Sequence, residues 1–301
     1  MELRHLRYFV AVAEELHFGR AALKLSIAQP PLSQQIQRLE KELGLLLFQR
    51  TKRRVQLTHA GQVFLREAKE TLAQADHAVK AAQRAGRGEL GQLVVGFVDS
   101  ALYAALPPIL RAFRSRFPEV ELVLRELNPS EQFMALQNGR LHAGFVRSVI
   151  RDETMVQRTI FPERLIAALP NDHPLAARTQ IPLGELSGEG FVIFPRALGQ
   201  GFYDQIMEMC RRSGFNPRVV QEANEMQTIV SLVAAGIGVA LVPWSVHNLR
   251  IKGVVYVEIA DPRAQTSMLV TWRKDDPTPV LQTFLAVVSE VADAEDKTML
   301  I

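Results

Sequence analysis

The chain of 301 residues is 48% hydrophobic, enough for two or three domains with well-filled cores, and its single cysteine excludes an intramolecular disulfide. Its formal net charge of +3 is unevenly spread, because residues 1–60 hold ten Lys and Arg against five Asp and Glu. Charged residues interrupt the apolar start and no apolar run reaches about 18 residues, so we expect a cytoplasmic protein without a signal peptide or membrane span.

Residues 18–61 predict a winged helix-turn-helix. Two short amphipathic helices are expected with a break at Gln29-Pro30-Pro31, because proline lacks an amide donor and disfavours a helical conformation in the residue before it. The apolar residues of the second helix share one face: Leu32, Ile36, Leu39 and Leu43. Its other face is rich in amides and basic groups, as expected of a helix that reads base edges. Gly44 ends this helix, and short strands are expected at residues 45–48 and 55–57.

The candidate DNA-binding residues lie on this second helix and on the loop between the two strands. On the helix they are Gln29, Pro30, Pro31, Ser33, Gln34, Gln37 and Arg38. On the wing they are Arg50, Lys52, Arg53 and Arg54, which we expect to contact phosphates and the minor groove. The alternative for these four cations is an ordinary exposed basic loop.

A long helix is predicted from about residue 60 to residue 85, with Thr58 as its N-cap. Its apolar residues form a narrow, heptad-like seam: Leu65, Ala68, Leu72, Ala75, Val79 and Ala82. The seam favours a dimerising linker helix over a helix packed only on its own domain. The following Gly86-Arg87-Gly88-Glu89-Leu90-Gly91 matches G-x-G-x-x-G, but it follows a helix and precedes a strand. It therefore predicts a hinge, not a dinucleotide-binding loop.

From residue 92 onward, strands alternate with helices and predict an α/β architecture with largely parallel sheets. Strands are expected at residues 93–98, 120–125, 141–146, 165–169, 191–194, 218–221, 239–242 and 267–272. Helices are expected near residues 102–117, 131–138, 201–213, 225–235 and 278–292. A chain that leaves one α/β lobe, builds another and returns resembles periplasmic binding proteins, whose ligand lies in the crevice at the carboxyl ends of the strands.

The N-terminal segment resembles the LysR-type bacterial transcriptional regulators. The matching residues are Ala21-Ala22, Leu25, Gln29-Pro30, Ser33, Ile36, Leu39-Glu40, Leu43-Gly44, Leu47-Phe48, Arg50, Leu57-Thr58 and Ala60-Gly61. The opening MELRHLRYFVAVAEE and the IAQPPLS turn are most similar to the branch that controls aromatic-compound catabolism. The resemblance implies a winged helix-turn-helix at residues 1–58, a linker helix and hinge at 59–89, and a two-lobed effector-binding domain at 90–301. Lobe I would comprise residues 90–161 and 266–301, and lobe II residues 162–265.

The resemblance also implies which residues line the effector crevice. They are Asp99, Ser100, Asn128, Pro129, Ser130, Arg147, Gln200, Phe202 and Glu225. Ser100 is expected to cap the helix after the first strand, and a helix N-terminus attracts anions. Arg147 follows a strand end and is expected at the crevice mouth, although it could be an ordinary surface arginine. Asp99 would oppose an anion and Pro129 lacks a hydroxyl, so a dicarboxylate is not expected unless Arg147 neutralises Asp99. The helix terminus at Ser100 and the charge of Arg147 nevertheless favour an anion, so we expect a small organic acid.

No catalytic or metal-binding constellation is apparent in the sequence. The seven histidines are scattered, no G-x-S-x-G or P-loop is present, and Cys210 is interpreted as a buried helix residue. We therefore expect no enzyme activity and no cofactor. The chain is interpreted as an effector-responsive activator or repressor of a catabolic operon, which binds an inverted-repeat operator as a homodimer or homotetramer and contacts RNA polymerase. The alternative is a solute-binding protein of the periplasmic type.

Overall fold

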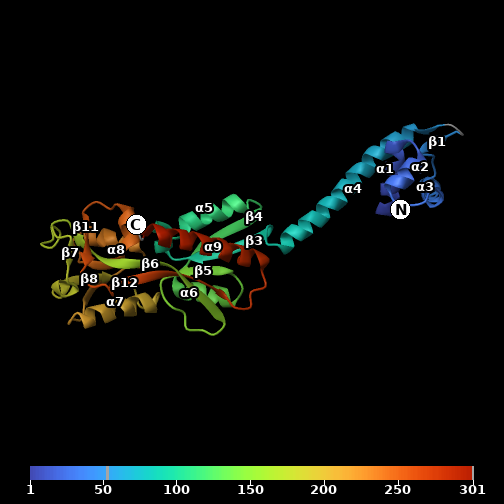
Figure 1. Ribbon diagram of the computed structural model, residues 1–301. Helices are drawn as coiled ribbons and strands as arrows, with labels where there is room; N and C mark the ends of the chain where they lie inside the picture. Colours follow the sequence, from blue (N-terminus) through green and yellow to red (C-terminus); the bar gives the residue numbers. More distant parts are fainter. Residues whose placement is uncertain (52–53, 300–301) are drawn as a thin grey trace. The chain divides into compact units, whose positions relative to one another are not determined.

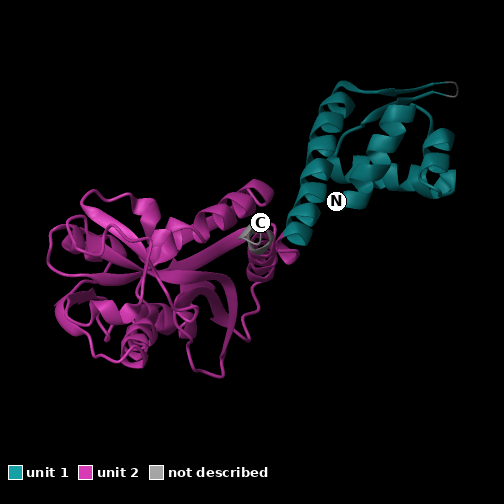
Figure 2. Cartoon of the chain, turned by 60° about the vertical axis from the view of Figure 1, so that its left-hand side comes forward, with its two compact units in different colours: residues 1–84 teal, residues 85–301 magenta. Residues whose placement is uncertain are grey.

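The computed structural model describes residues 1–51 and 54–299, and for residues 295–299 only the backbone. Its contacts divide the chain into two compact units, residues 1–84 and residues 85–301 (Figure 2). Each unit has its own hydrophobic core.

The first unit is a helix-turn-helix followed by a two-stranded wing. Its elements are α1 (Leu3–Glu15), α2 (Phe18–Lys24), α3 (Gln29–Leu43), β1 (Phe48–Arg50), β2 (Val55–Leu57) and α4 (His59–Gly86). A break before α3 is present, but it lies before Gln29 and not at Gln29-Pro30-Pro31 as predicted. These three residues form the first turn of α3, where a proline is tolerated because its missing amide would have no partner within the helix. Thr58 caps α4 as predicted, because its Oγ1 accepts a hydrogen bond from the Gly61 amide at 2.9 Å. Lys52 and Arg53 lie outside the described residues.

The first wing strand begins at Phe48, later than the predicted residue 45, and a buried carboxylate binds the backbone amides at its start. Glu40 of α3 is only 6% exposed. Its Oε1 accepts hydrogen bonds from the amides of Leu47 at 2.9 Å and Phe48 at 3.0 Å, and its Oε2 accepts one from Arg50 at 2.7 Å. Glu40 therefore fastens the wing to the helix before it.

The first half of the α4 seam packs within its own unit. Ala68 is buried there, and Leu65 and Leu72 pack against the same core as α1 and α3. Val79, further along, is 57% exposed. Intramolecular packing thus accounts for the seam up to Leu72 and leaves its apolar surface at Val79 in solvent.

The second unit is built on one large mixed sheet, and the expectation of largely parallel sheets is wrong for its centre. β3 (Gly91–Phe97) pairs in parallel with β4 (Val120–Glu126) and β5 (Ala143–Val146). β12 (Gln265–Arg273) runs antiparallel to β5 and to β6 (Met155–Pro170). β6 was predicted only as residues 165–169, but it is 16 residues long and continues from one lobe into the other.

The remaining strands surround the far end of β6. β10 (Ala240–Pro243) and β11 (Val254–Ile259) both pair antiparallel with it, and β7 (Gln180–Ile181) pairs in parallel with β11. β8 (Gly190–Ile193) and β9 (Arg218–Glu222) form a separate parallel pair. β7 and β11 were not predicted from the sequence.

The two lobes have separate cores at the two ends of β6. In lobe I, α5 (Leu106–Arg116) and α9 (Pro279–Met299) lie side by side on one face of the sheet (Figure 1), with Phe113 edge-on to Phe284. α6 (Pro129–Gln137) covers the other face. In lobe II the core lies among α7 (Gln200–Arg212), α8 (Met226–Ala234) and the strands. The described residues also contain the 3₁₀ helices η1 (Asp99–Tyr103), η2 (Leu183–Leu186) and η3 (Trp244–Leu249).

The single helix expected near residues 102–117 is two elements. η1 ends at Tyr103, and α5 starts at Leu106 with prolines in its first turn. Because a proline ring would clash with the carbonyl of the preceding turn, one helix cannot run through Pro107-Pro108. Ser100 consequently lies inside η1 and caps no α-helix, contrary to the prediction.

Candidate DNA interface and effector cavity

The outer face of α3 presents the predicted base-reading residues to solvent. Gln29, Pro30, Pro31, Gln34, Gln37 and Arg38 are exposed, and Ser33 is half-buried. On the opposite face, Leu32, Ile36 and Leu39 are completely buried in the core of the unit. The helix therefore has one side held by packing and one side of amides, a hydroxyl and a cation that is free to meet a ligand.

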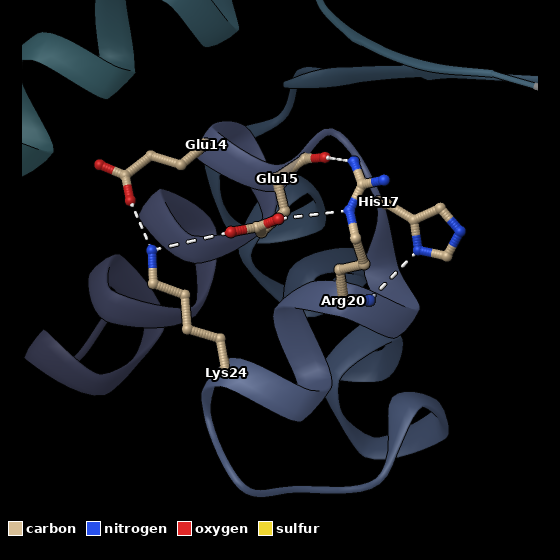
Figure 3. Close-up of polar contacts among 5 residues, drawn as sticks. All are labelled: Glu14, Glu15, His17, Arg20 and Lys24. Carbon is tan, nitrogen blue, oxygen red and sulfur yellow. Dashed lines mark hydrogen bonds and ion pairs between the residues drawn. The ribbon is translucent and has the colours of Figure 1, made fainter.

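Ion pairs at the corner between α1 and α2 neutralise part of the basic charge (Figure 3). Lys24 lies 3.1 Å from a Glu14 oxygen and 3.8 Å from a Glu15 oxygen. Arg20 pairs with the Glu15 side chain at 3.3 Å and donates to the Glu15 carbonyl, while its amide donates to His17 Nδ1. Hydrogen bonds from Lys69 and Lys24 keep the pKa of Glu14 below its ordinary value.

The other acidic residues of the first 60 are also paired. Glu2 pairs with Arg4, Glu42 with the N-terminal amine and Glu40 with Arg50. In the described part of this segment, the cations without a carboxylate partner are Arg7, Arg38, Lys41 and Arg54. Two of them lie on α3 and one on the wing, so the net positive charge of the unit is concentrated beside the amide-rich face.

Arg50 was predicted to bind phosphate, but its guanidinium is engaged in contacts within the unit. Its guanidinium pairs with Glu40 at 2.7 Å and lies over the Phe18 ring, 4.8 Å from the centroid. Both contacts hold β1 against α2 and α3. Of the four predicted wing cations, Arg54 alone is both described and unpaired.

The second unit contains a cavity of about 960 Å³ between its lobes. It is lined by the N-terminal turns of α6 and α7, by the loop after β5, and by residues of the paired strands β6 and β12. Four predicted effector residues line it: Pro129, Ser130, Arg147 and Gln200. Thr266 lines it as well, buried and with no hydrogen-bond partner for its hydroxyl among the described residues.

Three other predicted residues line a separate, smaller cavity of about 320 Å³: Asp99, Asn128 and Glu225. Asn128 accepts a hydrogen bond from the Glu131 amide at 3.0 Å and thereby caps α6. Glu126 shares this cavity, and burial, followed by the charges of Asp99 and Glu225, raises its pKa above the ordinary value. The smaller cavity is acidic and unsuited to an anion.

Arg147 lies deeper than predicted. It is 7% exposed, and its Nη1 lies 2.6 Å from an oxygen of Glu163 in β6. Its Nε donates to Ser100 Oγ at 2.8 Å. Glu163 also accepts from the Ser245 amide at 2.9 Å, so the cation and its partner are both held by hydrogen bonds. The charge of Arg147 is therefore neutralised by Glu163, not by Asp99.

Ser100 and Phe202 line neither cavity. Ser100 is 2% exposed and serves as the acceptor for Arg147. Phe202 belongs to the lobe II core with Ile206 and Cys210, which follow it at helical spacing on the same face of α7. Phe202 was predicted to line the effector crevice, but its side chain lies in the lobe II core.

Glu163, Ser245 and Thr266 were not predicted from the sequence as residues of this region. Glu163 precedes the apolar run from which the strand was predicted, and nothing local distinguishes it from a surface glutamate. Cys210 is buried as predicted, and burial raises the pKa of its thiol to about 12. In the described residues, no group of three His, Cys, Asp or Glu side chains could hold a metal ion, and no helix is long and apolar enough to span a bilayer.

Comparison with known families identifies both units. Residues 3–62 match the model for the bacterial regulatory helix-turn-helix proteins of the LysR family, and residues 86–293 match the LysR substrate binding domain. The chain belongs to the LysR family. It is a LysR-type transcriptional regulator with an N-terminal helix-turn-helix, a long helix and a two-lobed effector-domain fold.

Individual relatives are similar to this LysR-type regulator over nearly its whole length. It is 40% identical over 287 residues to the transcriptional regulator AlsR of Bacillus subtilis, covering 95% of each chain. It is 40% identical over 293 residues to CatR of Pseudomonas putida, covering 97% of this chain and 100% of that one. Full-length CbnR in complex with its target DNA superposes with a TM-score of 0.84 at 30% identity, over 97% of this chain and 100% of that one.

Proposed function

We propose that this regulator binds its operator through the outer face of α3 and the wing, and responds to a small molecule bound between its lobes. The observation that carries the proposal is the combination of the amide-rich face of α3 with the unpaired cations Arg38, Lys41 and Arg54. Amide side chains pair bidentately with adenine, while cations bind phosphate. Because the named relatives are transcriptional regulators, we infer that the chain has no catalytic activity.

Base reading is tested by a gel shift with DNA from upstream of the chain's own gene. We expect Ser33→Ala and Gln37→Ala each to weaken specific binding by about 1–3 kcal/mol per lost base contact, with little change in non-specific binding. Gln62→Ala, an exposed glutamine on α4, is the matched control and should bind as the wild type does. Unchanged specific affinity in both α3 variants would remove this helix from the reading role.

Phosphate binding is tested by the salt dependence of affinity. Arg38→Gln removes an unpaired cation, so we expect weaker binding to every sequence and a decrease of about 1 in the slope of log affinity against log salt. Arg20→Gln removes a cation already paired with Glu15 and should leave the slope unchanged. Equal slopes for Arg38→Gln and the wild type would refute the phosphate contact.

The seam on α4 supports a proposal that two chains pair through this helix and, as a homodimer or homotetramer, bind an inverted repeat. Leu72 packs within its own unit, so the informative change is Val79→Asp at the exposed end of the seam. We expect light scattering to show dissociation at micromolar concentration. Ala78→Asp adds the same charge beside the seam and should not dissociate the assembly. If light scattering gave the same mass for the Val79→Asp assembly as for the wild type, this part of α4 would not be in the interface between chains.

The large cavity supports an effector that is a small organic acid with further hydrogen-bonding groups. Most of the polar side chains in its lining carry hydroxyls or amides, including Ser130, Gln200 and the unpartnered Thr266. Arg147 contributes little net attraction for an anion, because Glu163 balances its charge. A thermal-shift screen of mono- and dicarboxylic acids on the full chain, repeated with Thr266→Val, tests this assignment. A contact with RNA polymerase remains a prediction.

A further inference from the structure

Two contacts made by η1 connect the lobes on the side of the smaller cavity. Asp99 Oδ2 accepts a hydrogen bond from the backbone amide of Met226, the first residue of α8, at 2.6 Å. The same oxygen accepts one from the Tyr103 hydroxyl at 3.0 Å. The Tyr103 carbonyl in turn accepts a hydrogen bond from Asn248 Nδ2 of η3 at 2.9 Å. Asp99 and Tyr103 belong to lobe I, whereas Met226 and Asn248 belong to lobe II.

The carboxylate at this position replaces a cap that α8 does not supply for itself. Glu225, in the N-cap position, makes no side-chain cap hydrogen bond. The first amides of a helix lack intrahelical partners, and the helix dipole makes that end attractive to negative charge. Asp99 supplies the missing acceptor from the other lobe, across a sequence separation of 127 residues. A helix cap that comes from another lobe holds the two lobes together as well as the helix.

We propose that Asp99 is an interlobe latch, one of the contacts that hold the two lobes in the arrangement seen here. Without it, η1 and η3 stay joined by the buried contacts of Arg147 with Ser100 and Ser245 and by the Tyr103–Asn248 hydrogen bond. Because the Tyr103–Asn248 bond is exposed to solvent, we expect it to open more often once Asp99 is released. Effector and latch then act on the same equilibrium between lobe arrangements, and an effector changes that equilibrium only through its different affinity for the two states. This regulatory consequence rests on the proposed function, whereas the latch itself does not.

Hydrogen exchange followed by mass spectrometry on the full, ligand-free chain tests the latch. For Asp99→Ala we expect exchange at least tenfold faster in peptides from both sides of the contact, namely residues 226–230 of α8 and 244–250 of η3. Asp99→Asn keeps an acceptor oxygen without the charge and should give a smaller increase in the same two places. Glu126→Gln is the matched control, because it removes an acid from the same cavity without a hydrogen bond to α8, and it should exchange as the wild type does.

A purely local cap predicts a different pattern. Faster exchange confined to residues 226–230, or no acceleration in Asp99→Ala, would overturn the latch. The regulatory consequence is tested with a reporter driven by the chain's own promoter and no added effector. We expect basal expression to change at least threefold with Asp99→Ala and to stay constant with Glu126→Gln. Unchanged expression in Asp99→Ala overturns the regulatory role. Failure of the wild type to bind the promoter would instead refute the proposed function and leave the exchange result standing.

Discussion

Glu40→Ala is expected to lower the free energy of unfolding of the first unit by about 2–5 kcal/mol, because it leaves the two buried amides of Leu47 and Phe48 without an acceptor. Arg50 loses its partner in the same step, so we expect the wing to detach from α3 and specific DNA binding to fall with stability. Urea unfolding of the full chain measures this change, and hydrogen exchange in peptides from residues 1–84 assigns the unfolding to the first unit.

The matched control is Glu42→Ala, two residues further along the same helix. Its carboxylate is exposed and pairs with the N-terminal amine, so the free energy of unfolding should be unchanged within error. Glu40→Gln keeps one acceptor oxygen for the amides and should lie between the two variants. A Glu40→Ala chain as stable as the Glu42→Ala chain would show that the carboxylate does not fasten the wing.

Arg147→Ala is expected to destabilise the second unit by about 3–5 kcal/mol, because Glu163 is then buried without a counter-charge. The double replacement Arg147→Met with Glu163→Met removes both charges and keeps comparable volume. It should recover most of the lost free energy of unfolding, since apolar residues often substitute for a buried ion pair at little cost. Thermal or urea unfolding of the second unit measures both variants.

The double variant separates two explanations for a chain that no longer responds to inducer. If Arg147 binds the effector directly, the response stays lost although stability returns. If Arg147 only joins the end of β5 to β6, the double variant should recover the response to inducer together with its stability. Failure of the double variant to recover any stability would show that Ser100 and Ser245 depend on the charges themselves, and the account of the pair would be wrong.

Much of the first unit could be predicted from sequence because its determinants are local. The prolines that begin α3, the spacing of Leu32, Ile36 and Leu39, and the Thr58 cap each act within a few residues. The face of α3 that presents Gln34 and Gln37 follows directly from helical periodicity. Glu40 is the exception, because its role depends on strand amides that the periodicity of α3 does not report.

The effector region was less predictable because its contacts join residues distant in sequence. Arg147 was recognised as important, but its partner Glu163 lies in a strand whose first half has no continuous apolar pattern. Asp99 was expected to line the effector crevice; it lines the smaller cavity and also accepts a hydrogen bond from the distant Met226 amide. Phe202 could have been assigned to the core, because Ile206 and Cys210 continue its helical face.

The length of β6 limits what any movement between the lobes can be. β6 and β12 form one ladder along most of β12, and β6 continues beyond it to pair with β10 and β11, so parting the lobes completely would break backbone hydrogen bonds. The register shifts between Met268 and Leu269, where β6 has the extra residue Ile160. Such a bulge leaves one residue unpaired, bends the strand and increases its twist, while the pairing continues on both sides of it. The lobes are therefore expected to turn by elastic torsion of a two-stranded ribbon. We therefore expect the rotation of one lobe against the other to be small and graded, and to reverse when a ligand leaves.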